Sequence, residues 1–141
     1  MNKTLDSKLV KVFPTLYRDR HASMMATCMC WGFDCGDGWY KIIWDLSEKL
    51  EPICKKLTEK LTKEQKEMGA RYCASQVKEK YGTLSFYMTF YDEPVESLVR
   101  KAEKKSGKTC EQCGAQGTLW NDFGWMSTRC DKCHKKDQRR T

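Results

Sequence analysis

Four cysteines near the C-terminus constrain the fold more than any other feature of the sequence. The segments CEQCG (110–114) and CDKCH (130–134) form the pattern C-x2-C-x16-C-x2-C. A two-residue spacer lets one tight turn direct two thiolates at the same ion, and zinc takes four such ligands in a tetrahedron. We therefore expect one structural Zn²⁺ bound by Cys110, Cys113, Cys130 and Cys133. The alternatives are free thiols, a redox pair or an iron–sulfur cluster, for which the usual final Cys-Pro step is missing.

A site closed by four thiolates has no open position for water or substrate, so this ion should stabilise the fold and perform no chemistry. His134 directly follows Cys133, and we expect its side chain on the surface rather than on the metal. The segment between the two cysteine pairs is rich in large apolar residues, including Trp120 and Trp125. It should form short strands beside the ion, whose aromatic side chains either pack on the rest of the chain or stack on bases.

The other 106 residues read as a small α+β domain, with helices packed on an antiparallel hairpin or sheet. We expect a domain at 1–106 and a zinc ribbon with a short basic tail at 107–141. A first helix is predicted at 4–13, with Thr4 as its cap. A second runs from Asp37 along an apolar stripe that ends at Leu61, and a third runs from Glu93-Pro94 to Gly107. Pro52 should kink or restart the second helix at 48–51.

Two strands are predicted at 72–77 and 83–91, because large apolar residues alternate with polar ones in the second segment. The five residues KEKYG between them fit a hairpin loop in which Gly82 takes a positive φ.

The charge and the number of cysteines indicate the cellular compartment and the kind of partner. The net charge is +7, but residues 107–141 carry seven basic and four acidic residues, and four thiolates with a divalent ion would reduce that +3 to about +1. Nine cysteines, an odd number, without an export signal indicate a reducing compartment. No apolar run reaches the roughly 20 residues that span a bilayer. We expect a cytoplasmic protein with no membrane association, and the oligomeric state stays open.

The stretch CMCWGFDCGDGW (28–39) is the second unusual feature. A second metal could be bound there by one histidine and three cysteines, namely His21, Cys28, Cys30 and Cys35. A nucleophilic cysteine is disfavoured because His21 and His134 are the only histidines and neither lies in a catalytic signature. The simplest interpretation is a buried turn in which Asp37 caps the following helix.

The same turn could also hold an anion at the start of that helix, where backbone N–H groups are unpaired. Such a nucleotide site would use Arg18, Arg20 and His21 for phosphate, together with the turn at Gly36, Asp37 and Gly38 and the ring of Trp39.

Four segments together resemble a family of small uncharacterised bacteriophage and prophage proteins: FPTLYRDR, CMCWGFDCGDGWY, ASQVKEKYGTLSFY and the two cysteine pairs. The resemblance runs from about Phe13 to Cys133. It implies expression inside an infected bacterial cell, and no activity comes with it.

Two functional hypotheses follow. The first is a non-enzymatic phage protein, of a host-takeover or anti-defence type, that binds a host protein or a signalling nucleotide. The alternative is a nucleic-acid-binding zinc ribbon. Its expected contacts are Trp120 and Trp125 on bases and Lys132, Lys135, Lys136, Arg139 and Arg140 on phosphates. An enzyme would need an open metal site in the N-terminal half.

Overall fold

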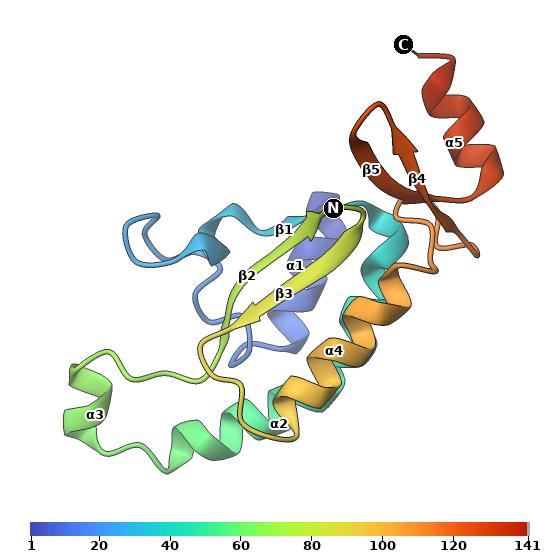
Figure 1. Ribbon diagram of the computed structural model, residues 1–141. Helices are drawn as coiled ribbons and strands as arrows, with labels where there is room; N and C mark the ends of the chain where they lie inside the picture. The colour runs from blue at the N-terminus through green and yellow to red at the C-terminus, as the bar shows by residue number, and fades with distance from the viewer. Residues whose placement is uncertain (141) are drawn as a thin grey trace.

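The computed structural model describes residues 1–140, so Thr141, the last residue of the predicted ribbon module, lies outside the described residues. The α-helices are α1 (Lys3–Val12), α2 (Tyr40–Glu59), α3 (Lys63–Glu67), α4 (Val95–Ser106) and α5 (Asp131–Gln138). The strands are β1 (Phe33–Asp34), β2 (Ala74–Lys80), β3 (Thr83–Met88), β4 (Thr118–Asp122) and β5 (Trp125–Arg129). The predicted α+β fold is confirmed, and α5 with the β4–β5 hairpin projects from one end of the molecule (Figure 1).

The central sheet has three strands in the order β1-β2-β3. Strands β2 and β3 form the predicted antiparallel hairpin, and β1 adds to the other edge of β2 in parallel, with Phe33 opposite Val77. Strand β1 is too short to produce a periodic pattern, which is why the sequence did not predict it.

The hairpin turn is tighter than predicted. Strand β2 continues to Lys80, so the connection consists of Tyr81 and Gly82 alone, with φ values of 52° and 84°. Two consecutive positive φ angles are those of a type I′ turn, whose twist matches that of paired strands. The positive φ of Gly82 is confirmed. The five-residue loop is wrong, because Lys78 and Lys80 pair within the sheet.

The outer edge of β3 is closed by side chains. The backbone N–H groups of Leu84 and Phe86 donate to Ser106 Oγ (2.8 Å) and Glu103 Oε1 (2.9 Å), both on α4. These acceptors occupy the edge that another strand would otherwise pair with. Helix α4 therefore packs on the sheet and also accepts hydrogen bonds from the N–H groups of its edge strand, β3.

The predicted apolar stripe lies on one continuous helix, α2, and packs into the core. Pro52 is inside α2, which continues through it, so a restart of the helix at 48–51 is wrong. Buried Leu50 and Cys54 flank Pro52, and their packing offsets the one backbone hydrogen bond that a proline removes. Helix α1 is capped by Asn2, whose side chain accepts from Leu5 N, and not by Thr4 as predicted. Within residues 1–140, no helix combines the length and the apolar character required to traverse a bilayer.

Candidate metal centre and the surface beside it

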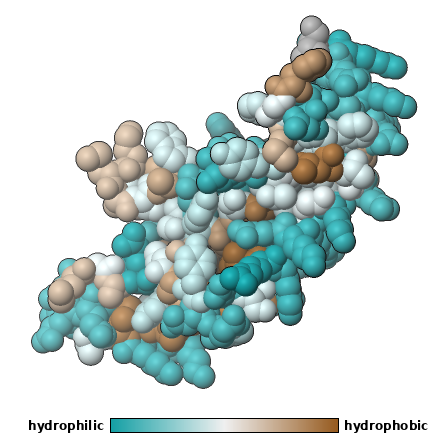
Figure 2. All heavy atoms as spheres, viewed as in Figure 1, coloured by the Kyte–Doolittle hydropathy of each residue, from teal (hydrophilic) through white to brown (hydrophobic). Residues whose placement is uncertain are grey.

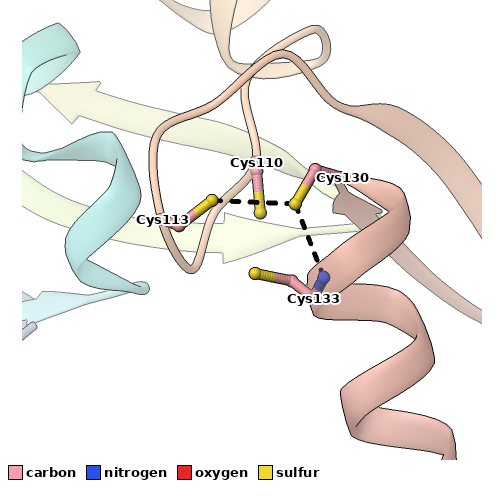
Figure 3. A group of neighbouring side chains, drawn as sticks. All are labelled: Cys110, Cys113, Cys130 and Cys133. Atoms are coloured by element: carbon pink, nitrogen blue, oxygen red, sulfur yellow. Dashed lines mark hydrogen bonds between the residues drawn. The ribbon is translucent and has the colours of Figure 1, made fainter.

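The four predicted ligand cysteines come together in space. Cys110 and Cys113 lie in the loop before β4, whereas Cys130 and Cys133 lie at the start of α5 (Figure 3). Their sulfur atoms are all within 4.8 Å of one another, and the Sγ atoms of Cys113 and Cys130 are 3.7 Å apart. Zinc–sulfur bonds of about 2.3 Å in a tetrahedron separate neighbouring sulfurs by about 3.8 Å. The four thiols are thus close enough together to bind one metal ion.

Backbone groups support this arrangement. Gly114, at φ 80°, donates its N–H to the carbonyl of Cys110, and the N–H of Cys133 donates to the sulfur of Cys130. Burial raises the pKa of Cys110, but N–H donors from Cys130, Cys113 and Gln112 outweigh it and bring that pKa to about 7. Burial, followed by the adjacent thiols, raises the pKa of Cys133 to about 12. A bound cation would favour the thiolate form of Cys133.

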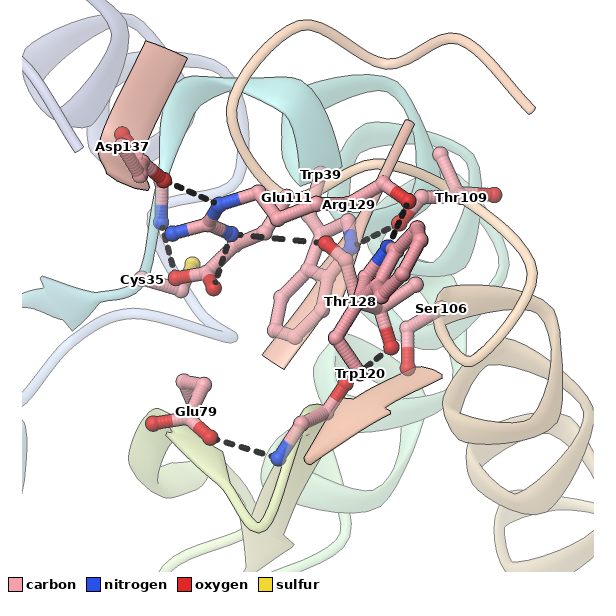
Figure 4. A network of polar contacts seen from close by, with 12 residues as sticks. Cys35, Trp39, Glu79, Ser106, Thr109, Glu111, Trp120, Thr128, Arg129 and Asp137 are labelled. Atoms are coloured by element: carbon pink, nitrogen blue, oxygen red, sulfur yellow. Dashed lines mark hydrogen bonds and ion pairs between the residues drawn. The ribbon is translucent and has the colours of Figure 1, made fainter. Parts of the chain in front are cut away.

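The turn CGDGW (35–39) is in contact with the loop that carries Cys110 and Cys113. Gly38 donates its N–H to the carbonyl of Glu111 (2.7 Å), and Gly36 donates to Glu111 Oε1 (2.9 Å). The buried Trp39 ring donates from Nε1 to the carbonyl of Thr109 (2.8 Å), as Figure 4 shows. Residue 111 lies between the first two metal ligands. The metal site and the beginning of α2 are therefore in direct contact.

This contact explains the glycines of the motif. A Cβ atom on Gly38 would lie 2.2 Å from the carbonyl oxygen of Cys110, and one on Gly36 would lie 2.4 Å from that of Glu111. Both neighbours are backbone atoms, which cannot rotate away. Only glycine permits this approach.

The predicted nucleotide site is contradicted by these contacts. The N–H groups of Gly36 and Gly38 that were expected to bind an external anion already bind Glu111. Arg20 is paired with Asp6 at 2.9 Å and also donates to the Cys30 carbonyl. An anion does bind at this turn, as expected for such N–H groups, but it is the protein's own carboxylate.

Two further expectations at this turn are corrected. Asp37 does not cap α2; its carboxylate accepts from the backbone and side chain of Asn2 instead. The ring of Trp39 is fully buried and unavailable for stacking. Arg18, by contrast, is 44% exposed in its side chain, lies 3.8 Å from Asp19 and has no role at the turn.

The second metal site is also contradicted. Among residues 1–140, metal-ligating side chains converge only at the four ribbon cysteines, so His21, Cys28, Cys30 and Cys35 do not form a site. Residues 28–31 form a 3₁₀ turn, in which side chains two residues apart, such as those of Cys28 and Cys30, point in different directions. Cys35 is buried in the core, and that burial raises its pKa to about 12.

The sequence did not predict the pairing of Glu111 with Arg129 at this junction. Arg129 donates to Glu111 Oε2 (2.8 Å) and to Asp137 Oδ2 (3.2 Å), and thereby joins the first cysteine pair, β5 and α5 (Figure 4). The position of Glu111 between two ligand cysteines was the available signal. Its partner in β5 could not be identified without the fold.

The two faces of the β4–β5 hairpin have different roles. On one face, Thr128 is buried and donates from Oγ1 to the carbonyl of Gly82, which fixes the hairpin to the β2–β3 turn. On the other face, α5 packs over Trp120, and the His134 ring stacks on it at 3.8 Å between centroids. His134 is only 7% exposed and lies 2.8 Å from Asp122 Oδ2. Its predicted surface position is therefore wrong.

Most of the predicted nucleic-acid contacts are accessible. Trp125 is 73% exposed, and the neighbouring Phe123, at the hairpin tip, is fully exposed. Trp120 is the exception, because His134 covers its ring. The predicted basic residues of the C-terminus are all exposed: Lys132, Lys135, Lys136, Arg139 and Arg140. Figure 2 shows hydrophobic atoms of this projecting end beside hydrophilic ones.

A groove of about 530 Å³ lies between the tip of the hairpin and α5. Phe123 and Trp125 line it from the hairpin, and His134 and Asp137 line it from the helix. We call the hairpin and α5 together the ribbon–helix unit. It carries the exposed aromatic side chains, the basic residues and this groove.

Comparisons of the chain with models of protein families, with curated proteins and with solved structures find no match.

Proposed function

We propose that the protein is a non-enzymatic binding protein whose ribbon–helix unit binds single-stranded nucleic acid. The observation that carries the proposal is the position of exposed Trp125 and Phe123 on the hairpin that packs against a basic helix. Single-stranded nucleic acids are bound by this combination, with aromatic rings for bases and cations for the backbone.

The cations occupy one side of α5. Lys135 and Lys136 follow Lys132 by three and four residues, so all three share a helix face, and Arg139 and Arg140 continue it. The opposite face contains Cys133 and His134, which are buried against the hairpin. Phosphate groups would bind along the exposed face, which gives binding a steep dependence on salt.

Zinc is the ion that we propose for the four-thiolate site, because four soft ligands in a tetrahedron suit Zn²⁺. When bound, zinc cross-links the loop before β4 to α5 and performs no reaction. The chain's own Arg129 supports the same junction through Glu111 and Asp137. The ion therefore stabilises the unit that presents the binding surface.

A host protein is a second candidate partner, favoured by a separate exposed surface. Met24, Met25 and Trp31 are 62%, 92% and 66% exposed, and all lie in the segment between α1 and β1. Patches of exposed apolar side chains are typical of protein-binding sites, and these three residues fall within eight positions of the sequence. The resemblance to phage proteins gives the setting of this proposal, an infected bacterial cell.

Fluorescence anisotropy with a labelled 12-nucleotide dT strand tests the nucleic-acid proposal. We expect Trp125→Ala to weaken binding about tenfold, since stacking on one aromatic contributes about 1–3 kcal/mol per base. The double variant Lys135→Glu/Lys136→Glu should weaken binding and lower the salt dependence by roughly one to two phosphate contacts.

The matched control is Lys63→Glu/Lys66→Glu, which makes the same charge change on α3, at the far end of the molecule (Figure 1). It should bind almost as the natural protein does. If both charge variants lost the same amount of affinity, net charge alone would account for binding. An absence of binding at low salt would contradict the proposal and favour a protein partner.

A further inference from the structure

We propose that the groove of the ribbon–helix unit selects a guanine base in single-stranded nucleic acid. This inference rests on the proposed function and adds base preference to it. The groove has a volume of about 530 Å³, within the range of roughly 300–1,000 Å³ that small-ligand pockets occupy.

The register of the hairpin places an aromatic ring beside a carboxylate. Trp125 on β5 is directly opposite Asp122 on β4, and both line the groove. Directly opposed side chains in antiparallel strands have Cβ atoms about 5 Å apart. A base stacked on the exposed Trp125 ring would therefore present one edge to the Asp122 carboxylate.

Two of the polar side chains that line the groove, Asp122 and Asp137, are carboxylates, which only accept hydrogen bonds; the others are Ser127, Arg129, His134 and Gln138. Asp122 is 40% exposed in its side chain and uses Oδ2 for His134, and Asp137 is 43% exposed and uses Oδ2 for Arg129. Arg129 also lines the groove, and its Nε and Nη1 groups already donate to Asp137 and Glu111. A bound group must therefore bring hydrogen-bond donors to Asp122.

Guanine meets this requirement best among the bases. Its Watson–Crick edge has two adjacent donors, N1–H and the N2 amino group, which match the two oxygens of one carboxylate, with Oδ2 of Asp122 accepting from His134 as well. Thymine and uracil present one N–H between two carbonyl oxygens, which a carboxylate repels. Adenine and cytosine present a single amino donor beside a ring nitrogen that is an acceptor.

The test measures binding of 12-nucleotide dT strands in which one central base is guanine, hypoxanthine, adenine or thymine. Hypoxanthine is guanine without the N2 amino group, so this comparison removes one donor and leaves the ring. We expect the guanine strand to bind about tenfold more tightly than the thymine strand, since a bidentate base contact discriminates by about 1–3 kcal/mol. The hypoxanthine strand should lie between them.

Asp122→Asn replaces one carboxylate oxygen by a donor amide and should reduce the guanine preference to within twofold. Asp131→Asn is the matched control. It makes the same charge change on α5 at an exposed position outside the groove, and it should keep the preference. Metal content and circular dichroism of both variants verify that they are folded.

Equal affinity for guanine and hypoxanthine strands in the natural protein would overturn the inference, as would an intact preference in Asp122→Asn. Either result would leave salt-dependent binding, and with it the proposed function, in place. Failure of all four strands to bind would overturn both.

Discussion

Gly38 donates its backbone N–H to the carbonyl oxygen of Glu111 over 2.7 Å, across 73 residues of sequence. The same Glu111 accepts from Gly36 through its side chain and pairs with Arg129 on β5. The turn that begins α2 is therefore attached to the loop that carries the first two metal ligands. Loss of the metal should weaken this attachment as well as the ribbon.

The first prediction concerns the close approach at Gly38. Gly38→Ala would place a Cβ atom 2.2 Å from the carbonyl oxygen of Cys110. We expect the free energy of unfolding to fall by about 2 kcal/mol or more, measured by urea denaturation, because backbone must shift.

Gly107→Ala provides the control for this substitution. Its Cβ would meet Thr83 Cγ2 at 3.4 Å, an ordinary contact, and its φ of −66° suits alanine. The effect there should be within about 0.5 kcal/mol. Equal stability of the two variants would show that the turn and the loop are not packed as described.

A second prediction concerns the ion. Protein purified under reducing conditions should contain one zinc per chain, and X-ray absorption should show four sulfur neighbours at about 2.3 Å. Removal of zinc by a chelator should lower the melting temperature, because binding energy of a structural ion is part of the folding energy. An oxygen ligand on zinc, or a disulfide among the four cysteines, would contradict a closed site.

The third prediction concerns alkaline pH. Burial raises the pKa of Cys54 to about 12 and that of Cys73 to about 11, from about 9 in the unfolded chain. The unfolded chain therefore loses these protons first, and the stability contributed by the two neutral thiols is lost as pH rises from about 9 to about 11 for Cys73 and to about 12 for Cys54.

Urea midpoints of the zinc-bound protein at pH 8 and pH 10.5 measure this effect, and the midpoint should fall. In Cys54→Ala the fall should be smaller, because one of the buried thiols is gone. A midpoint that rises with pH, or a fall of the same size in Cys54→Ala, would be the opposite of what we expect.

The features that follow from local patterns could be predicted from the sequence. The spacing of Cys110, Cys113, Cys130 and Cys133 gave the metal ligands, and the 3.6-residue apolar repeat gave α2. The ligand prediction depends on a known spacing of cysteines, and the helix prediction depends on residues that are close together in the chain.

Other features depend on contacts between distant segments and could not be predicted in this way. Unpaired N–H groups at Gly36 and Gly38 correctly indicated an acceptor, but a carboxylate of the same chain competes with any ligand at high effective concentration. The expected surface position of His134 rested on its neighbour Cys133 alone, whereas the ring of Trp120 on β4 covers it in the fold. Strand β1 likewise exists only through its pairing with β2.

The most direct test of nucleic-acid binding by the ribbon–helix unit is a ¹H–¹⁵N NMR titration of the zinc-bound protein with a 12-nucleotide single strand. We expect the largest shifts at the Trp125 indole N–H and at the amides of residues 122–140, with little change at residues 28–40. Shifts concentrated at residues 28–40, or no shifts at low salt, would contradict the proposed binding surface.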